Sequence, residues 1–180
     1  MTILSIEEEV KQKIREVPNF PKEGINFYDI TTAIKDANTM KKIIDYFVDK
    51  FKDKKIDYIA GIESRGFIFG MPIAYSLNCG FVPIRKPKKL PAETIGVDYS
   101  LEYGTDRIEI HKDAIEKGKR VLIIDDLLAT GGTAGAACSL IRKTEGELVG
   151  VGFLAELEFL NGREKLPKDI EVVTMLKYQE

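Results

Sequence analysis

The stretch VLIIDDLLATGGT, residues 121–133, restricts the fold of this chain more than any other part of the sequence. Its first four residues are apolar and three of them are β-branched, a pattern typical of a buried strand in the middle of a parallel sheet. Two carboxylates, Asp125 and Asp126, follow where we expect that strand to end. A glycine loop comes next, and the small residues at 134–137 predict that a helix begins there. The stretch therefore predicts a strand, an acid pair, a glycine loop and a helix, in that order.

A sugar phosphate is a ligand that this order of elements can bind. The backbone N–H groups of a loop that opens a helix can converge on one phosphate, and the helix dipole favours the negative charge. The acid pair would repel a phosphate, but it can accept hydrogen bonds from the two hydroxyls of a ribose. The loop is neither a Walker A sequence nor G-x-G-x-x-G. The alternative is a structural turn with capping acids. The candidate phosphate-loop residues are Ala129, Thr130, Gly131, Gly132 and Thr133.

Composition limits the classes of function that remain. A chain of 180 residues is long enough for one domain with a substantial core. A net charge of −2, with both signs interspersed, argues against a general nucleic-acid binder. We expect no membrane segment, because no apolar stretch reaches the roughly 18 residues needed to span a bilayer, and the acidic N-terminus shows no signal peptide. Two isolated cysteines, Cys79 and Cys138, predict reduced thiols and a cytoplasmic protein.

The motif at 121–133 resembles the phosphoribosyl-pyrophosphate signature of the type I phosphoribosyltransferases, and its LLATGGT portion is most similar to that of the adenine phosphoribosyltransferases. The alternation of strands and helices itself favours an α/β fold. The resemblance implies a single phosphoribosyltransferase domain over residues 1–180. It further implies a mostly parallel central sheet flanked by helices, a small N-terminal hood at about 19–34 and a flexible β-hairpin lid at about 94–111.

The N-terminal part begins with an expected helix over residues 5–17, which Pro18 ends. The aromatic residues of the following segment, NFPKEGINFYDITT, either anchor a loop on the core or form a hood that stacks on a planar base. The resemblance favours the hood. It implies that Phe27 stacks on the base and that the backbone of Ile25 and Asn26 reads the edge of the base. Tyr28 stands where many family members carry an arginine, so we assign it no base contact.

A second strand, expected at 56–62, leads into a polar turn, ESRG, and then a helix. Arg65 in this turn is suited to bidentate recognition of an oxyanion, although a lone arginine in a capping turn is more often a surface residue. Since ligands of open α/β sheets sit at the carboxyl ends of strands, this turn and the Asp125 turn could flank one crevice. The resemblance makes the turn the pyrophosphate loop, with a non-proline cis peptide at Glu63–Ser64.

A basic run follows the short strand FVPIR, which Pro83 suggests is an edge strand. The run is either a solvated face or a cationic cup for pyrophosphate that leaves a ribose. The resemblance favours the cup for Arg85, and also for Lys86 and Lys89.

Residues 94–111 alternate apolar and polar side chains around Gly104, which predicts a β-hairpin. Such a hairpin can act as a lid that excludes water; the alternative is a simple edge hairpin. YSLEYG resembles the mobile catalytic loop of the family, which implies that Glu102 handles a ring proton of the purine and that Tyr103 closes over the diphosphate. The resemblance also places Leu157 on the far face of the base, although an ordinary core leucine is the alternative.

The resemblance implies transfer of 5-phosphoribosyl from phosphoribosyl pyrophosphate to adenine, which yields AMP and pyrophosphate in purine salvage. Mg²⁺ is expected to bind through the substrate diphosphate, because the sequence shows no dedicated protein cage for a metal. The family implies a homodimer. Two alternatives stay open: the same fold acting on another base such as xanthine, and a non-catalytic module that binds phosphoribosyl pyrophosphate and regulates a partner.

Overall fold

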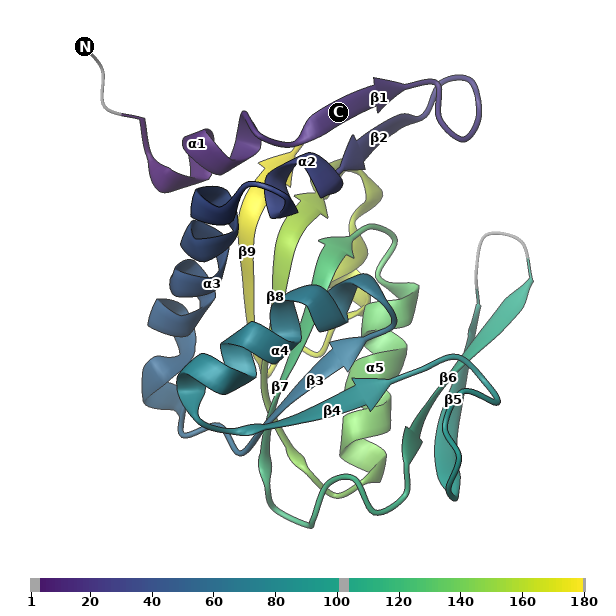
Figure 1. Ribbon diagram of the computed structural model, residues 1–180. Helices are drawn as coiled ribbons and strands as arrows, with labels where there is room; N and C mark the ends of the chain where they lie inside the picture. Colours follow the sequence, from purple (N-terminus) through teal and green to yellow (C-terminus); the bar gives the residue numbers. More distant parts are fainter. Residues whose placement is uncertain (1–3, 101–103, 180) are drawn as a thin grey trace. The chain divides into compact units, whose positions relative to one another are not determined.

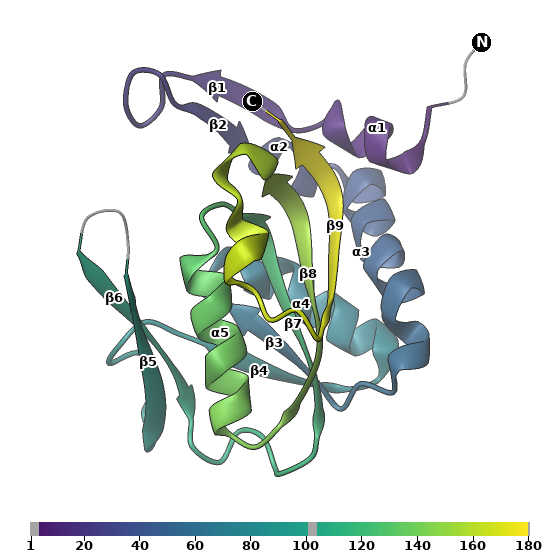
Figure 2. The same ribbon diagram turned by 180° about the vertical axis from the view of Figure 1, so that it is seen from behind.

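The structure is a computed structural model that describes residues 4–100 and 104–179 (Figures 1 and 2). The chain divides into two compact units, residues 1–46 and 47–180. The expectation of one domain over 1–180, with its hood and lid boundaries, stays a prediction.

The first unit opens with helix α1 (Ile6–Lys11), whose N-terminus is closed by a capping box between Ser5 and Glu8. The prediction that this helix continues to residue 17 was wrong. Strand β1 (Arg15–Pro18) follows and pairs antiparallel with β2 (Asn26–Asp29), ahead of the short helix α2 (Thr31–Ile34). Thr32 fixes the connection between α1 and β1, because its hydroxyl donates to the carbonyl of Lys13 at 2.6 Å and accepts from the N–H of Arg15 at 3.1 Å.

Helix α3 (Ala37–Phe51) crosses the boundary between the units. Within the second unit its last turn buries Phe47 and Phe51. Both rings lie against strand β8, where only glycines leave them room: a Cβ on Gly152 would lie 3.2 Å from the Phe47 ring. A short 3₁₀ helix, η1 (Lys52–Lys54), leads to the sheet.

Five parallel strands form the central sheet of the second unit, in the order β4-β3-β7-β8-β9. Their bounds are β3 (Tyr58–Ile62), β4 (Gly80–Ile84), β7 (Arg120–Leu128), β8 (Glu147–Leu157) and β9 (Glu171–Tyr178). β7 is the middle strand and β4 an edge strand, as the apolar run and Pro83 predicted. β7 does not end at the acid pair, because its pairing with β8 continues to Leu128.

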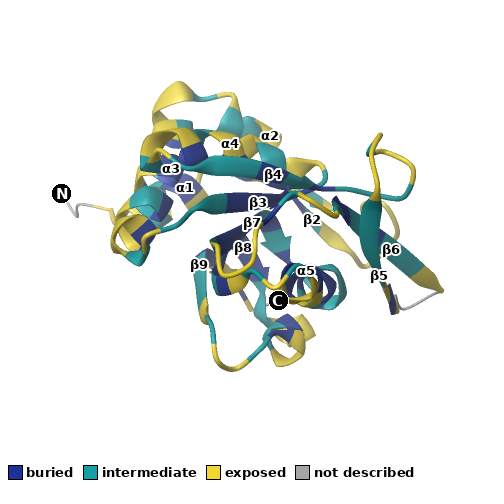
Figure 3. Cartoon of the chain, turned by 90° about the horizontal axis from the view of Figure 1, so that it is seen from below, coloured by how far each residue is buried: buried dark blue, intermediate teal, exposed yellow. Residues whose placement is uncertain are grey.

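Helices cover both faces of this sheet. α4 (Arg65–Leu77) lies on the face that the last turn of α3 covers, and α5 (Gly132–Lys143) lies on the other (Figure 3). The core on the α5 side contains the buried side chains of Val121, Ile123, Phe153 and Ile141. Alternate residues of β7 point to opposite faces, so a strand in this position must be apolar on both sides.

The predicted hairpin is formed by β5 (Thr94–Ser100) and β6 (Thr105–His111), which pair antiparallel. It is joined to the edge of the sheet through reciprocal backbone hydrogen bonds between Arg85 and Glu109, of 2.9 and 2.7 Å. Two 3₁₀ helices, η2 (Glu158–Leu160) and η3 (Gly162–Lys165), connect β8 to β9.

Candidate active site

A pocket of about 240 Å³ opens at the carboxyl ends of β3 and β7, the edge where open α/β sheets bind ligands. It brings together residues from the turn after β3, from the end of β4 and from the motif at 121–133. Most of the predicted phosphoribosyl-binding residues line it: Arg65, Lys86, Asp125, Asp126, Ala129, Thr130, Gly131, Gly132 and Thr133. Arg85 and Lys89 are not among the lining residues. The crevice between the two turns is therefore formed, but with fewer of the predicted cations.

The phosphate loop leads directly into α5. Gly131 is the N-cap of this helix, with φ 78° and ψ −2°, a left-handed conformation that glycine adopts without strain. Within the described residues, the first turn of α5 holds no acidic residue, and its N-cap, a glycine, supplies no side-chain cap. The N–H groups at a helix start need hydrogen-bond acceptors that the helix itself cannot supply. These N–H groups, together with the helix dipole, give the pocket a binding site for an anion.

The acid pair lies inside the same pocket. Asp126 is buried, and its Oδ2 lies 3.0 Å from Nε of Arg65, whose side chain stays 45% exposed. Asp125 is half-buried and accepts a hydrogen bond from the N–H of Asp126 at 2.8 Å. Gly66 permits this approach of α4 to β7, because a Cβ there would lie 2.6 Å from the carbonyl oxygen of Ile124.

Burial governs the ionisation of both acids. Burial raises the pKa of Asp125 well above its usual range, and the neighbouring charge of Asp126 adds to this effect. Burial also raises the pKa of Asp126, although the guanidinium of Arg65 opposes the shift. Two adjacent carboxyls that share one desolvated site resist carrying two full charges. A diol that donates hydrogen bonds to them would favour their charged forms.

The turn after β3 contains the cis peptide Glu63–Ser64 that the family resemblance implied. Glu63 is a residue that sequence reasoning missed. Its carboxylate accepts hydrogen bonds from Nε and Nη2 of Arg85 at 3.1 and 3.3 Å, and from the N–H of Lys86 at 2.9 Å. Although burial would raise the pKa of Glu63, these hydrogen bonds lower it. Glu63 thus holds Arg85 beside the pocket and orients the backbone that carries Lys86 into it.

A second network that sequence reasoning missed ties the hairpin to the phosphate loop. The Tyr99 hydroxyl accepts hydrogen bonds from Nζ of Lys86 at 3.0 Å and from the hydroxyl of Thr133 at 3.2 Å. It donates to Asp106 at 3.1 Å, and Lys86 also forms an ion pair with Asp106. The hydrogen bond from Lys86 lowers the pKa of Asp106. Tyr99 and Asp106 therefore set the position of one cation and one hydroxyl of the pocket.

The structure does not test the predicted base-binding and lid residues. Ile25 and Asn26 are exposed residues of the first unit, and the Phe27 ring packs edge-to-face on Phe20 with centroids 5.3 Å apart. Leu157 is the half-buried last residue of β8 in the second unit. The assignment of these four residues to the base stays a prediction. Glu102 and Tyr103 lie outside the described residues, so their roles also stay predictions.

A parallel sheet that holds a helix-opening phosphate loop, an acid pair and two cations around one pocket is the architecture of a phosphoribosyl-binding α/β protein. Residues 31–180 match the family model described as the phosphoribosyl transferase domain. Adenine phosphoribosyltransferase of Trichodesmium erythraeum is 56% identical over 170 residues, which cover 94% of this chain and 99% of that protein.

Solved structures agree with this match. The crystal structure of adenine phosphoribosyltransferase from Thermoanaerobacter pseudethanolicus superposes with a TM-score of 0.92 and 50% identity, and covers 96% of this chain and 99% of that one. The Saccharomyces cerevisiae enzyme, complexed with D-2,5-dideoxy-2,5-imino-altritol 1,6-bisphosphate and adenine, has a TM-score of 0.90 and 45% identity, with 96% and 99% covered. The chain belongs to the adenine phosphoribosyltransferase family, a family of pentosyltransferases. The family, fold class and enzyme class inferred from the sequence are confirmed.

Two further findings concern membrane-spanning helices and metal-binding side chains. Within residues 4–100 and 104–179, no helix is both long and apolar enough to cross a membrane. In the same described part of the chain, no three or more His, Cys, Asp or Glu side chains gather into a group that could hold a metal ion.

Proposed function

We propose that the pocket carries out the reaction of its family, in which adenine and phosphoribosyl pyrophosphate give AMP and pyrophosphate in purine salvage. The observation that carries this proposal is the meeting of the phosphate loop and the acid pair in one pocket at the carboxyl edge of the sheet. A 5′-phosphate and a ribose diol sit side by side in the substrate, and the pocket offers a matching pair of subsites. The relatives named above support adenine as the base.

In this proposal the N–H groups at the start of α5 bind the 5′-phosphate, and Thr130 and Thr133 add hydroxyl donors. Asp125 and Asp126 accept the two ribose hydroxyls. The Arg65 ion pair engages Nε, and nearly half of the side chain remains exposed, so its terminal nitrogens can hold a diphosphate oxygen while Nε holds Asp126. Arg65 would thus connect the ribose and diphosphate subsites.

The reaction breaks the bond between C1 of the ribose and the diphosphate oxygen and forms a bond from C1 to N9 of adenine, and the ring proton of adenine passes to a base, the role that we propose for Glu102. Positive charge develops on the ribose, and negative charge develops on the leaving diphosphate. Fixed cations beside the diphosphate stabilise that charge as it forms. Arg65 and Lys86 line the pocket and are the cations that we assign to this task, while Arg85 lies outside the lining in an ion pair with Glu63.

Mg²⁺ is proposed to enter with the diphosphate. This ion commonly keeps several waters and binds through one or two carboxylates together with substrate phosphates. Because the acid pair is assigned to the ribose hydroxyls, the ion would be held by the diphosphate oxygens and by water, and a preformed cage is not needed. When bound, Mg²⁺ would supply positive charge that offsets the diphosphate oxygens.

We also propose that the chain acts as a homodimer in the cytoplasm. Ile68, Met71 and Tyr75 recur on one face of α4 and are 38, 53 and 88% exposed, an apolar stripe that supports self-association. Both cysteines are free thiols, which supports a reducing compartment. Light scattering on the purified protein measures its mass, and a monomer at micromolar concentration would contradict the dimer.

A turnover assay tests the proposed function. Purified protein is supplied with Mg²⁺, phosphoribosyl pyrophosphate and labelled adenine, and unlabelled adenine, hypoxanthine, guanine and xanthine compete in separate reactions. We expect AMP and pyrophosphate in equal amounts, with adenine the only strong competitor. Stronger competition by xanthine would assign the fold to another base. Tight binding of phosphoribosyl pyrophosphate without AMP formation would instead indicate a regulatory module.

A further inference from the structure

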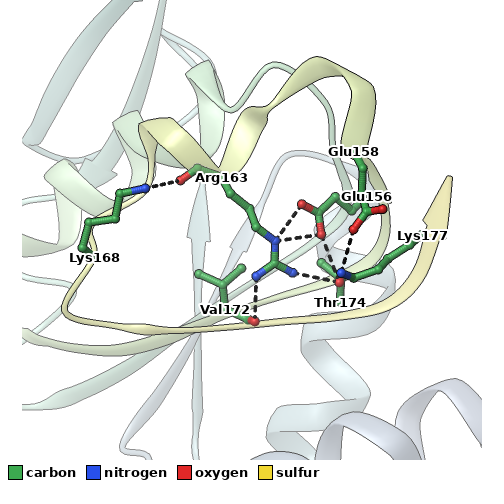
Figure 4. A network of polar contacts seen from close by, with 7 residues as sticks. All are labelled: Glu156, Glu158, Arg163, Lys168, Val172, Thr174 and Lys177. Carbon is green, nitrogen blue, oxygen red and sulfur yellow. Dashed lines mark hydrogen bonds and ion pairs between the residues drawn. The ribbon is translucent and has the colours of Figure 1, made fainter. Parts of the chain in front are cut away.

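An ion pair between a buried carboxylate and a partly exposed arginine lies behind the phosphate loop, outside the pocket. Glu156 near the end of β8 is only 3% exposed, and both of its carboxylate oxygens accept from Nε of Arg163, at 2.7 and 2.9 Å (Figure 4). The hydroxyl of Thr174 on β9 donates to Glu156 at 3.1 Å and accepts from Nη2 of Arg163 at 3.0 Å. Nη1 of Arg163 donates to the carbonyl of Val172 at 3.3 Å. We call Glu156, Arg163 and Thr174 the Arg163 network.

This network anchors η3 to two strands of the sheet. Arg163 is the second residue of η3, and all three of its guanidinium nitrogens bond to β8 or β9. A planar guanidinium held at three positions can neither rotate nor slide without losing a bond. Gly162, the residue directly before Arg163, therefore has its position set by the sheet.

Gly162 is in backbone contact with the phosphate loop. A Cβ on Gly162 would lie 2.2 Å from the carbonyl oxygen of Ala129 and 3.0 Å from the N of Gly131. Conversely, a Cβ on Gly131 would lie 2.1 Å from the carbonyl oxygen of Gly162. The first turn of α5 meets the same element, since a Cβ on Gly135 would lie 2.8 Å from the carbonyl oxygen of Lys165. Two glycine backbones thus pack on each other with no side chain between them.

Stability alone is a weak reason for such a network. Burying a carboxylate removes it from water, and an ion pair recovers that cost incompletely, so apolar residues in the same place often give equal stability. What an apolar cluster does not provide is a fixed direction for each bond. Functional loops need supports that lock their geometry to within about 0.5 Å.

We propose that Arg163 is a positioning residue for the 5′-phosphate. Held by Glu156 and Thr174, it fixes Gly162, and Gly162 in turn fixes the backbone of Ala129 and Gly131 that binds the phosphate. Arg163 does not line the pocket and acts only through this contact. The inference rests on the proposed function and extends it to a residue outside the site.

Four variants test the inference. Arg163→Met removes the guanidinium but leaves the buried Glu156 charge unpaired, which by itself destabilises. Arg163→Met with Glu156→Gln removes both charges, and Arg163→Lys keeps one charge but not the three-way attachment. Arg142→Met is the matched control, because Arg142 forms a similar two-oxygen contact with Asp169, at 2.7 and 2.8 Å, at the opposite end of α5.

Calorimetry measures the Kd of each variant for ribose 5-phosphate and for pyrophosphate with Mg²⁺, and steady-state kinetics separate the KM values for phosphoribosyl pyrophosphate and adenine. Circular dichroism confirms the folded state. We expect Arg163→Met and the double variant to bind ribose 5-phosphate about 10- to 100-fold more weakly, with the Kd for pyrophosphate and the KM for adenine unchanged. The affinity of Arg163→Lys for ribose 5-phosphate should fall between those of these variants and the wild type, and the affinity of Arg142→Met should equal that of the wild type.

Folded Arg163 variants that bind ribose 5-phosphate like the wild type would overturn the inference. Equal losses for ribose 5-phosphate and pyrophosphate would also overturn it, because they would indicate a general structural effect. If Arg163→Met does not fold, the double variant and Arg163→Lys still decide the question. Failure of the proposed function would look different, since the wild type itself would then form no AMP.

Discussion

Gly131→Ala is the substitution that tests the phosphate loop most directly. Gly131 adopts φ 78°, a region where a residue with a Cβ is less stable by about 1–2 kcal/mol. The new Cβ would also lie 2.1 Å from the carbonyl oxygen of Gly162, whereas ordinary contact begins at 3.4 Å, so the two backbones must separate by about 1.3 Å. Because the Arg163 network holds Gly162 in place, we expect the phosphate loop to make most of that movement.

A displacement of about 1 Å in a positioning group can lower catalysis by roughly 100-fold. We therefore expect kcat/KM for phosphoribosyl pyrophosphate to fall by about that factor in Gly131→Ala, and the Kd for ribose 5-phosphate to rise. Steady-state kinetics and calorimetry provide the two measurements. The free energy of unfolding in urea should fall by at least the 1–2 kcal/mol due to the left-handed backbone.

Gly118→Ala is the matched control for this prediction. Gly118 has nearly the same φ, 77°, but a Cβ there would meet nothing within 4 Å. It should therefore lose the same conformational stability and keep its full activity. If Gly131→Ala were as active as Gly118→Ala, the contact with Gly162 would have no role in the site, and the reasoning about the loop would be refuted.

Three further predictions concern single side chains. Asp126→Asn should bind ribose 5-phosphate roughly 10- to 100-fold more weakly, as expected for loss of hydrogen bonds to a charged group. It should melt no earlier than the wild type, because the substitution removes a buried charge whose pKa burial raises. Unfolding seen by circular dichroism would indicate a structural role instead. A hydrogen bond from Thr31, with help from Arg15, lowers the pKa of Asp29 to about 2, so the stability that this carboxylate contributes is complete above about pH 4 and is lost as the pH falls through about 2. The difference in unfolding free energy between the wild type and Asp29→Asn should shrink over that interval, and a constant difference would argue against the shift. Burial raises the pKa of Cys138 to about 12, so its thiol should react with a maleimide at pH 8 only after denaturant is added; rapid labelling of the native protein at this residue would contradict its burial.

The sequence predicted those parts of the fold that depend on neighbours along the chain. The apolar run before Asp125 identified β7 as a central strand, and Pro83 identified β4 as an edge strand. The helix expected over residues 5–17 failed after Lys11, because pairing with β2 outweighs a helical apolar repeat in Arg15–Pro18. The end of β7 was misplaced for a similar reason, since β8 continues to pair beyond the acid pair.

The candidate site was predicted less completely, because its supports join residues far apart in the sequence. The hydrogen bonds between Glu63 and Arg85 and between Tyr99 and Thr133 join residues that are 22 and 34 positions apart in the sequence, so no local pattern reveals them. Glu156 did carry a signal. A carboxylate within the apolar strand GFLAELEF must be buried or at its edge, and a buried carboxylate requires a partner. Such a search would have pointed toward the arginine in NGREKL.

The place of β9 in the chain has a consequence for the order of folding. Thr174 and Val172 belong to a strand that follows the phosphate loop by some 40 residues and can join the sheet only alongside β8. Until β9 joins the sheet, a chain that has formed β3, β7, β8 and α5 offers Arg163 only one of its two strands. If Arg163 positions the 5′-phosphate as proposed, the phosphate loop therefore gains its support late, after most of the hydrophobic core has condensed.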